Sequence, residues 1–174
     1  MKELQRTFSI NILNSFLEQY KEEFKAFENR YEQLCAALDK AMEESQNQQK
    51  QYLNSLHDKE VQSLMKRLDG QNKEELTVLS KSHKDKNELA RIKRELQQKL
   101  IDQAVQERQR LQLLLDKRKI ELLEKHKKQE RKLQEEKKHL LDEKQQECEQ
   151  KSEHMKQKFN ECGESFFIKM FGLE

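Results

Sequence analysis

Leucine recurs at every eleventh position in the second half of the chain. The row consists of Leu89, Leu100, Leu111, Leu122 and Leu133, and Val78 precedes it by the same interval. Because eleven residues make almost three α-helical turns, this row stays on one side of a nearly straight helix. The spacing therefore predicts a long helix that lies lengthwise against a partner.

A second apolar ladder, with alternating steps of three and four, runs through the first part of the chain. Its members are Ile10, Leu13, Leu17, Tyr20, Phe24, Phe27, Tyr31, Leu34, Leu38 and Ala41. These steps follow the heptad rule of a coiled coil. The ladder thins through residues 43–51 and resumes from Tyr52 in a shifted frame, which predicts a stutter where the coil straightens.

Composition favours long helices over a globular domain. The chain of 174 residues is 39% charged and 33% hydrophobic, with three glycines and no proline. Too little apolar surface is present for a round core, and the dominant residues are good helix formers. We therefore expect an all-α, elongated coiled coil of two long helices, either a helical hairpin or a parallel rod that becomes stable on oligomerising.

We expect three segments, which are a heptad helix at 1–70, a long charged helix at 71–161 and an apolar tip at 162–174. Asp69 and Gly70 interrupt the first helix, and Asn72 with Glu75 has the form of a capping box for the second. A hairpin turn is thus expected near Gly70. A helix that continues through Gly70 stays open as an alternative, because one internal glycine costs only about 1 kcal/mol. Residues 80–83 form a second weak point.

The tip holds aromatic and aliphatic side chains after a glycine. The residues are Phe166, Phe167, Ile168, Met170 and Phe171. Soluble chains seldom leave such a cluster bare. We expect either a docking tip for a protein or a membrane, or a segment that folds back to cover the end of the helices.

Charge is unevenly distributed along the chain, although the formal net charge is only +2. Residues 81–132 carry seventeen Lys and Arg against nine Asp and Glu, whereas residues 1–70 carry ten against twelve. Such a basic stretch is either a solvated helix face or a surface that attracts phosphate. No aromatic residue lies between Tyr52 and Phe159, which disfavours nucleic acid. An acidic membrane surface or an acidic protein is the expected partner of this stretch.

Motifs for catalysis, cofactors or metals are absent from the sequence. It has no glycine-rich phosphate loop, and its five histidines are not spaced to place two ligands on one helical face. We therefore expect no enzyme, no cofactor, no metal and no small-molecule substrate. Three scattered cysteines and the lack of a signal peptide or transmembrane run favour a cytoplasmic protein, with a nuclear one as an alternative.

One stretch resembles the distal C-terminal tail of the phospholipase C β family. It runs from Asp116 to Lys127 and continues with Leu133 and Glu135-Glu136-Lys137, and the similarity covers about residues 30–140. The resemblance implies a long antiparallel helical coil that dimerises and engages membranes and G-protein α subunits without being catalytic. The aromatic ladder is also similar to the coils of synaptonemal lateral-element proteins, which would imply a structural protein of chromosomes.

From these patterns we expect a non-catalytic interaction protein that acts as a scaffold, tether or regulatory module. Its partner is a second copy or another coiled-coil protein. The residues expected to carry self-association are Leu13, Leu17, Tyr20, Phe24, Phe27, Tyr31, Leu34 and Leu38, with Leu89, Leu100, Leu111 and Leu122 in the longer seam. The alternatives are a regulatory tail that binds a membrane surface or a G protein, and a chromosome-axis coil.

Overall fold

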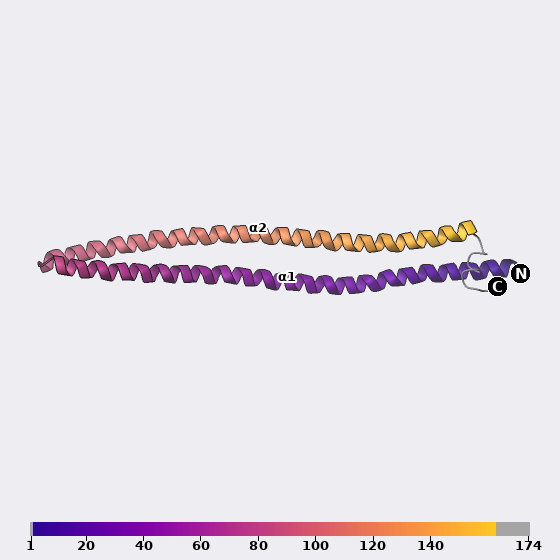
Figure 1. The fold of residues 1–174 in the computed structure, drawn as a ribbon, viewed down its shortest axis with the longest axis horizontal. Helices are drawn as coiled ribbons and strands as arrows, with labels where there is room; N and C mark the ends of the chain where they lie inside the picture. The colour runs from indigo at the N-terminus through magenta and orange to yellow at the C-terminus, as the bar shows by residue number, and fades with distance from the viewer. Residues whose placement is uncertain (1, 163–174) are drawn as a thin grey trace. The chain divides into compact units, whose positions relative to one another are not determined.

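The computed structural model describes residues 2–162, which form two long α-helices. Helix α1 comprises Lys2–Ser82 and helix α2 comprises Lys86–Cys162 (Figure 1). No strand occurs in this part of the chain. The all-α hairpin is confirmed, and its turn lies at residues 83–85 rather than near Gly70. The expected tip at residues 166–171 lies outside the described residues.

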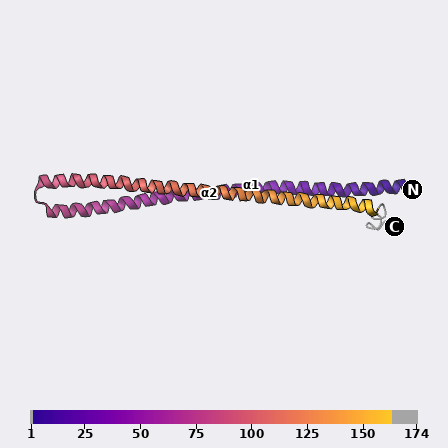
Figure 2. The same ribbon diagram turned by 90° about the horizontal axis from the view of Figure 1, so that it is seen from above.

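Contacts divide the hairpin into two units. Unit 1 combines the start of α1, up to Met42, with α2 from Gln129 onward, and unit 2 spans Glu43–Lys128. Unit 2 contains the turn, so its two helical segments run antiparallel (Figure 2). In unit 1, Glu23 pairs with Lys151 and Asp39 with Lys137. This order of pairing is again antiparallel.

Both helices of unit 2 bury residues at every eleventh position. In α1 the buried or half-buried rows are Leu53 with Leu64, and His57 with Leu68 and Leu79. In α2 they are Leu89, Leu100, Leu111 and Leu122, and Ala104, Leu115 and His126. A repeat of eleven residues in three turns keeps these rows facing the partner helix along its length. A row of residues spaced by seven would instead move gradually around the surface of a straight helix. The expected leucine row is therefore part of the seam between α1 and α2.

Unit 1 follows the same repeat, which corrects the heptad interpretation of residues 10–41. The rows of α1 are Ser9, Tyr20, Tyr31 and Met42, and Leu13, Phe24 and Cys35. The heptad frame agrees with these rows at the central aromatic residues but places Leu34 in the seam. In the structure Leu34 is 53% exposed and Cys35 is half-buried. The seven-residue ladder drifts off the seam at both ends, because its repeat of seven residues in two turns does not match the repeat of eleven residues in three turns that the buried rows follow.

The turn is set by local hydrogen bonds after His83. The backbone N–H of Asn87 donates to Asp85 Oδ1 at 3.1 Å, and Leu89 N–H donates to the Asp85 carbonyl at 3.0 Å. Asp85 is thus the N-cap of α2, a role for which its short carboxylate is well suited. At the expected capping box, by contrast, Asn72 lies inside α1, and its buried side-chain oxygen has no hydrogen-bond partner among the described residues.

Because Gly70 lies inside α1, the change Gly70→Ala is expected to stabilise the protein. A Cβ at this position would meet no atom within 4 Å, and alanine is favoured over glycine in a helix by about 0.8–1 kcal/mol. Urea unfolding of the variant and the native chain measures this difference. A loss of stability would indicate that Gly70 is part of a turn with a special backbone conformation.

Candidate interaction surfaces

Most residues expected to mediate self-association lie in the seam within one chain. Leu13, Leu17, Tyr20, Phe24, Phe27 and Tyr31 are half-buried in unit 1, as are Leu89, Leu100, Leu111 and Leu122 in unit 2. Leu34 and Leu38 are instead exposed, by 53% and 41%. Association of two chains through these twelve residues stays a prediction. Leu34 and Leu38 are the members of the set that are accessible to another molecule.

Tyr31 links the two helices of unit 1. Its hydroxyl donates a hydrogen bond to the Lys137 carbonyl at 2.6 Å, and its ring stacks on Phe27 with centroids 5.9 Å apart. Burial raises the pKa of Tyr31, and the neighbouring Cys35 thiol adds to this shift. The ring of Phe27 lies under the Lys144 ammonium, 5.7 Å from its centroid. The aromatic residues of the ladder therefore serve the hairpin itself.

Four lysines in the α2 segment of unit 1 lie near carboxylates: Lys137, Lys144, Lys151 and Lys156. Lys137 pairs with Asp39, and Lys151 lies 3.9 Å from Glu23 and 3.2 Å from Glu147. The hydrogen bond from Lys151 holds the pKa of Glu147 below its ordinary value, and that bond raises the pKa of Lys151. The ammonium groups of Lys137 and Lys151 lie over the seam and are paired, so they are not free to bind another anion.

Unit 2 contains polar contacts across its seam. Arg118 donates from one nitrogen to both carboxylate oxygens of Glu60, at 3.0 and 3.1 Å. His126, which is 3% exposed, contacts Gln49 through Nε2 at 2.8 Å. In the part of the chain that the structure describes, His126 Nδ1 and the side-chain amide nitrogen of the buried Gln46 have no hydrogen-bond partner. These contacts fix which residues of α1 face which residues of α2.

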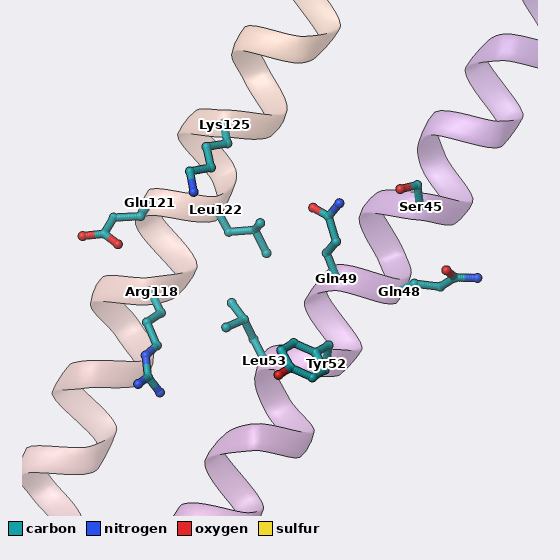
Figure 3. Close-up of a pocket in the computed structure, with 9 residues that line it drawn as sticks. All are labelled: Ser45, Gln48, Gln49, Tyr52, Leu53, Arg118, Glu121, Leu122 and Lys125. Carbon is teal, nitrogen blue, oxygen red and sulfur yellow. The ribbon is translucent and has the colours of Figure 1, made fainter.

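An open groove of about 600 Å³ lies beside these contacts (Figure 3). Leu53 and Leu122 extend toward each other between the two helices, and Gln49 points into the same space (Figure 3). The other lining residues are mostly polar: Ser45, Gln48, Tyr52, Arg118, Glu121 and Lys125. The groove has one carboxylate on its wall and mixed charge, so it offers neither a metal site nor a concentrated anion site.

Basic residues gather on one side of α2 in unit 2. Four adjacent rows on this side start at Lys86, Asn87, Ala90 and Arg94 and repeat at every eleventh residue up to Lys127. Their charged members are five cations and one anion: Lys86, Arg94, Arg108, Lys119 and Lys127, and Asp116. None of these cations forms an ion pair in the described residues. We call this side the cationic flank.

Apolar side chains interrupt the cationic flank. Ile101, Val105, Ile120 and Leu123 belong to the same four rows and are 58%, 50%, 59% and 46% exposed. The rows on the opposite side start at Glu88, Arg91, Ile92 and Glu95 and carry six cations against five anions. The excess of basic residues in this part of α2 therefore lies on the cationic flank, where exposed apolar side chains stand between the charged ones. The composition of residues 81–132 predicted the charge, and the eleven-residue spacing, applied to charged residues, could also have located the flank.

Residues 2–162 contain no cluster of three or more side chains suited to holding a metal ion. Neither α1 nor α2 is long and apolar enough in any stretch to span a bilayer.

Comparison with known proteins relates the whole chain to one family. The family model described as the PLC-beta C terminal matches residues 1–174. The chain is 30% identical over 115 residues to a Drosophila melanogaster protein named 1-phosphatidylinositol 4,5-bisphosphate phosphodiesterase classes I and II. This match covers 66% of the chain but 9% of the relative. No solved structure gives a significant match.

Proposed function

The chain belongs to the phospholipase C β C-terminal family, and we propose from this premise that it is a non-catalytic regulatory module that rests on an anionic membrane surface. The relative's name states that it acts on phosphatidylinositol 4,5-bisphosphate, a lipid with an anionic headgroup. A module of this kind would hold a lipid-directed enzyme at the membrane. The catalytic activity in the relative's name is not part of this proposal, since the match covers 9% of that protein.

The cationic flank is the observation that carries the proposal. A helix that lies in a membrane interface combines basic residues with apolar ones that enter the headgroup region. Arg94, Arg108, Lys119 and Lys127 are exposed and form no ion pair within residues 2–162, and Ile101 and Val105 lie between them. Each Lys or Arg near an anionic leaflet contributes about 1 kcal/mol. The flank therefore provides several kcal/mol of attraction in one direction.

Reversing two charges on this flank is expected to weaken membrane binding at least tenfold. The variant is Arg94→Glu with Arg108→Glu, and the measurement is co-sedimentation with vesicles of phosphatidylcholine and phosphatidylserine. Because the attraction is electrostatic, binding of the native chain should also fall as salt is raised. Vesicles of phosphatidylcholine alone should bind weakly.

Lys117→Glu with Lys128→Glu is the matched control. It makes the same change in net charge on the opposite side of α2, where cations and anions are nearly balanced. Binding of this control should stay within about threefold of the native chain, since about 1 kcal/mol per contacting charge is lost only on the flank that touches lipid. Equal losses in the two variants would show that net charge, rather than the flank, determines binding.

A further inference from the structure

A second groove lies next to the turn, between the end of α1 and the start of α2. It has a volume of about 560 Å³ and is lined by Glu74, Glu75, Val78, Leu79, Ile92, Glu95, Leu96 and Lys99. Four of these eight residues are aliphatic. Val78 is 62% exposed, whereas Leu79, Ile92 and Leu96 are half-buried. The groove therefore has an apolar floor that nothing in the described part of the chain covers.

The sequence explains why the helices leave this space open. The row of Leu53 and Leu64 continues at position 75, where the residue is glutamate. Glu75 is exposed, and the neighbouring Leu76 is half-buried in its place. An ionised carboxylate is costly to bury without a partner, so this row leaves the seam at Glu75, whereas the row of His57 and Leu68 stays in the seam at Leu79. The missing apolar side chain at position 75 leaves the groove open beside Val78.

Carboxylates surround this apolar floor. Glu74 and Glu75 form no ion pair in the described residues, and Glu95 lies 4.0 Å from Arg91. Lys99 is the one cation on the lining, against three glutamates. Two other grooves of unit 2 are different: one near Asp102 has no aliphatic lining residue, and one near Leu64 carries three cations. We call this groove, which lies next to the turn at residues 83–85, the turn groove. Its lining suits a segment whose apolar side chains are flanked by basic ones.

Residues 117–128 of α2 have this chemistry. They contain six Lys and Arg against two Glu. Ile120 and Leu123, one helical turn apart, are 59% and 46% exposed, and Lys119 and Lys127 border them on the cationic flank. On the flank itself the two parts are alike, with Arg94 and Arg108 in one and Lys119 and Lys127 in the other. The whole stretch 94–108, however, has three cations and three anions and therefore no net positive charge.

We propose that the turn groove of one chain binds residues 117–128 of a second copy. Ile120 and Leu123 enter the groove beside Val78 and Ile92, as the anchors of an amphipathic helix enter an apolar groove. Lys119 and Lys127 lie against Glu74 and Glu75. Complementary charge selects this partner segment and its orientation. The contact goes beyond the membrane proposal and is measured without lipid.

The two surfaces lie on different sides of α2, which determines the kind of assembly. Ile92, Glu95 and Lys99 belong to the rows opposite the cationic flank. A chain can therefore offer its groove to one neighbour and its basic segment to another. Such a heterologous contact does not close into a two-fold dimer. The mass of the assembly is expected to rise with protein concentration rather than stop at two chains.

Charge reversal with rescue tests this contact. The first variant is Glu74→Lys with Glu75→Lys, and the second is Lys119→Glu with Lys127→Glu. Light scattering at low salt should show that the native chain associates and that each variant alone associates at least tenfold more weakly, because groove and segment then have like charge. An equimolar mixture of the two variants should regain association, since each groove then meets a segment of opposite charge.

Two further measurements make the result specific. Lys50→Glu with Lys66→Glu reverses the same number of charges on exposed residues of α1, outside both the groove and the segment, and should leave association unchanged. Circular dichroism should show equal helix content in all variants. A native chain that keeps the mass of one chain at every concentration would overturn the proposal. Failure of the mixture to regain association, or equal loss in the control, would also overturn it.

Discussion

Leu115→Ala is expected to lower the free energy of unfolding by about 2 to 3 kcal/mol, which is toward the lower end for a buried leucine. Leu115 is 6% exposed and lies in the middle of the seam of unit 2. Truncation removes apolar contact with α1 and leaves a cavity. A seam of two helices can partly close over that cavity, which is why the lower part of the range is expected. Urea unfolding followed by circular dichroism measures the loss.

Leu113→Ala is the matched control for this prediction. Leu113 lies two residues away in the same helix and is 69% exposed. Alanine has the higher helix propensity, so the control should be neutral within about 0.5 kcal/mol. Similar losses at both positions would show that α2 does not pack on α1 through the eleven-residue rows.

The Glu60–Arg118 pair is expected to have a coupling energy of about 1 to 2 kcal/mol. The side chains are 28% and 31% exposed, and Arg118 donates to both carboxylate oxygens. Hydrogen bonds between charged groups contribute about 1.5–3 kcal/mol when they are shielded from water, and partial exposure reduces this value. A double-mutant cycle with Glu60→Ala and Arg118→Ala separates the coupling from the loss of each side chain.

An exposed ion pair of unit 1 provides the comparison. Lys21 and Glu18 lie 3.3 Å apart, with side chains 74% and 65% exposed. The same cycle on this pair should give a coupling below about 0.5 kcal/mol. If the two pairs couple equally weakly, Glu60 and Arg118 do not help to align the helices.

The eleven-residue spacing of leucines was the most informative sequence pattern. That spacing correctly placed four leucines in the seam: Leu89, Leu100, Leu111 and Leu122. Side chains eleven residues apart point in nearly the same direction from a straight helix. The heptad prediction for residues 10–41 of α1 was wrong about which residues face α2 at the two ends of this ladder. Seven-residue and eleven-residue patterns coincide at Tyr20, Phe24, Phe27 and Tyr31, so the aromatic residues could not distinguish them. The small residues Ser9 and Cys35 occupy seam positions that a search for large apolar groups overlooks.

The position of the turn could not be read from local signals alone. Asp69-Gly70 and Asn72/Glu75 are typical of a helix boundary, yet α1 passes through them. A break there costs seam contacts along both helices, whereas a glycine inside a helix costs only about 1 kcal/mol. The turn at 83–85 allows Glu60 to meet Arg118 and Gln49 to meet His126. Pairing between residues distant in sequence therefore outweighed the local signals.

The charge of residues 81–132 was predicted from composition, but its direction becomes apparent only when the eleven-residue spacing is applied to the charged residues. Arg94, Arg108 and Lys119 share the side with the basic excess, whereas the cations on the other side are nearly balanced by anions such as Glu88, Glu95 and Glu121. Partner contacts in the structure also separate free cations from paired ones: Arg118 binds Glu60, whereas Lys127 has no such partner in the described residues. Counting charges along a sequence cannot make this distinction.

A fluorophore on each side of α2 tests the central claim, which is that the cationic flank faces an anionic membrane. In a chain whose three cysteines are replaced by alanine, an environment-sensitive dye is attached to a cysteine at position 105 or at position 117. With phosphatidylserine-containing vesicles, emission from position 105 should shift to the blue, because Val105 would enter the apolar edge of the headgroup region, while emission from position 117 should stay as in water. Equal shifts at both positions, or a shift at 117 alone, would contradict the account.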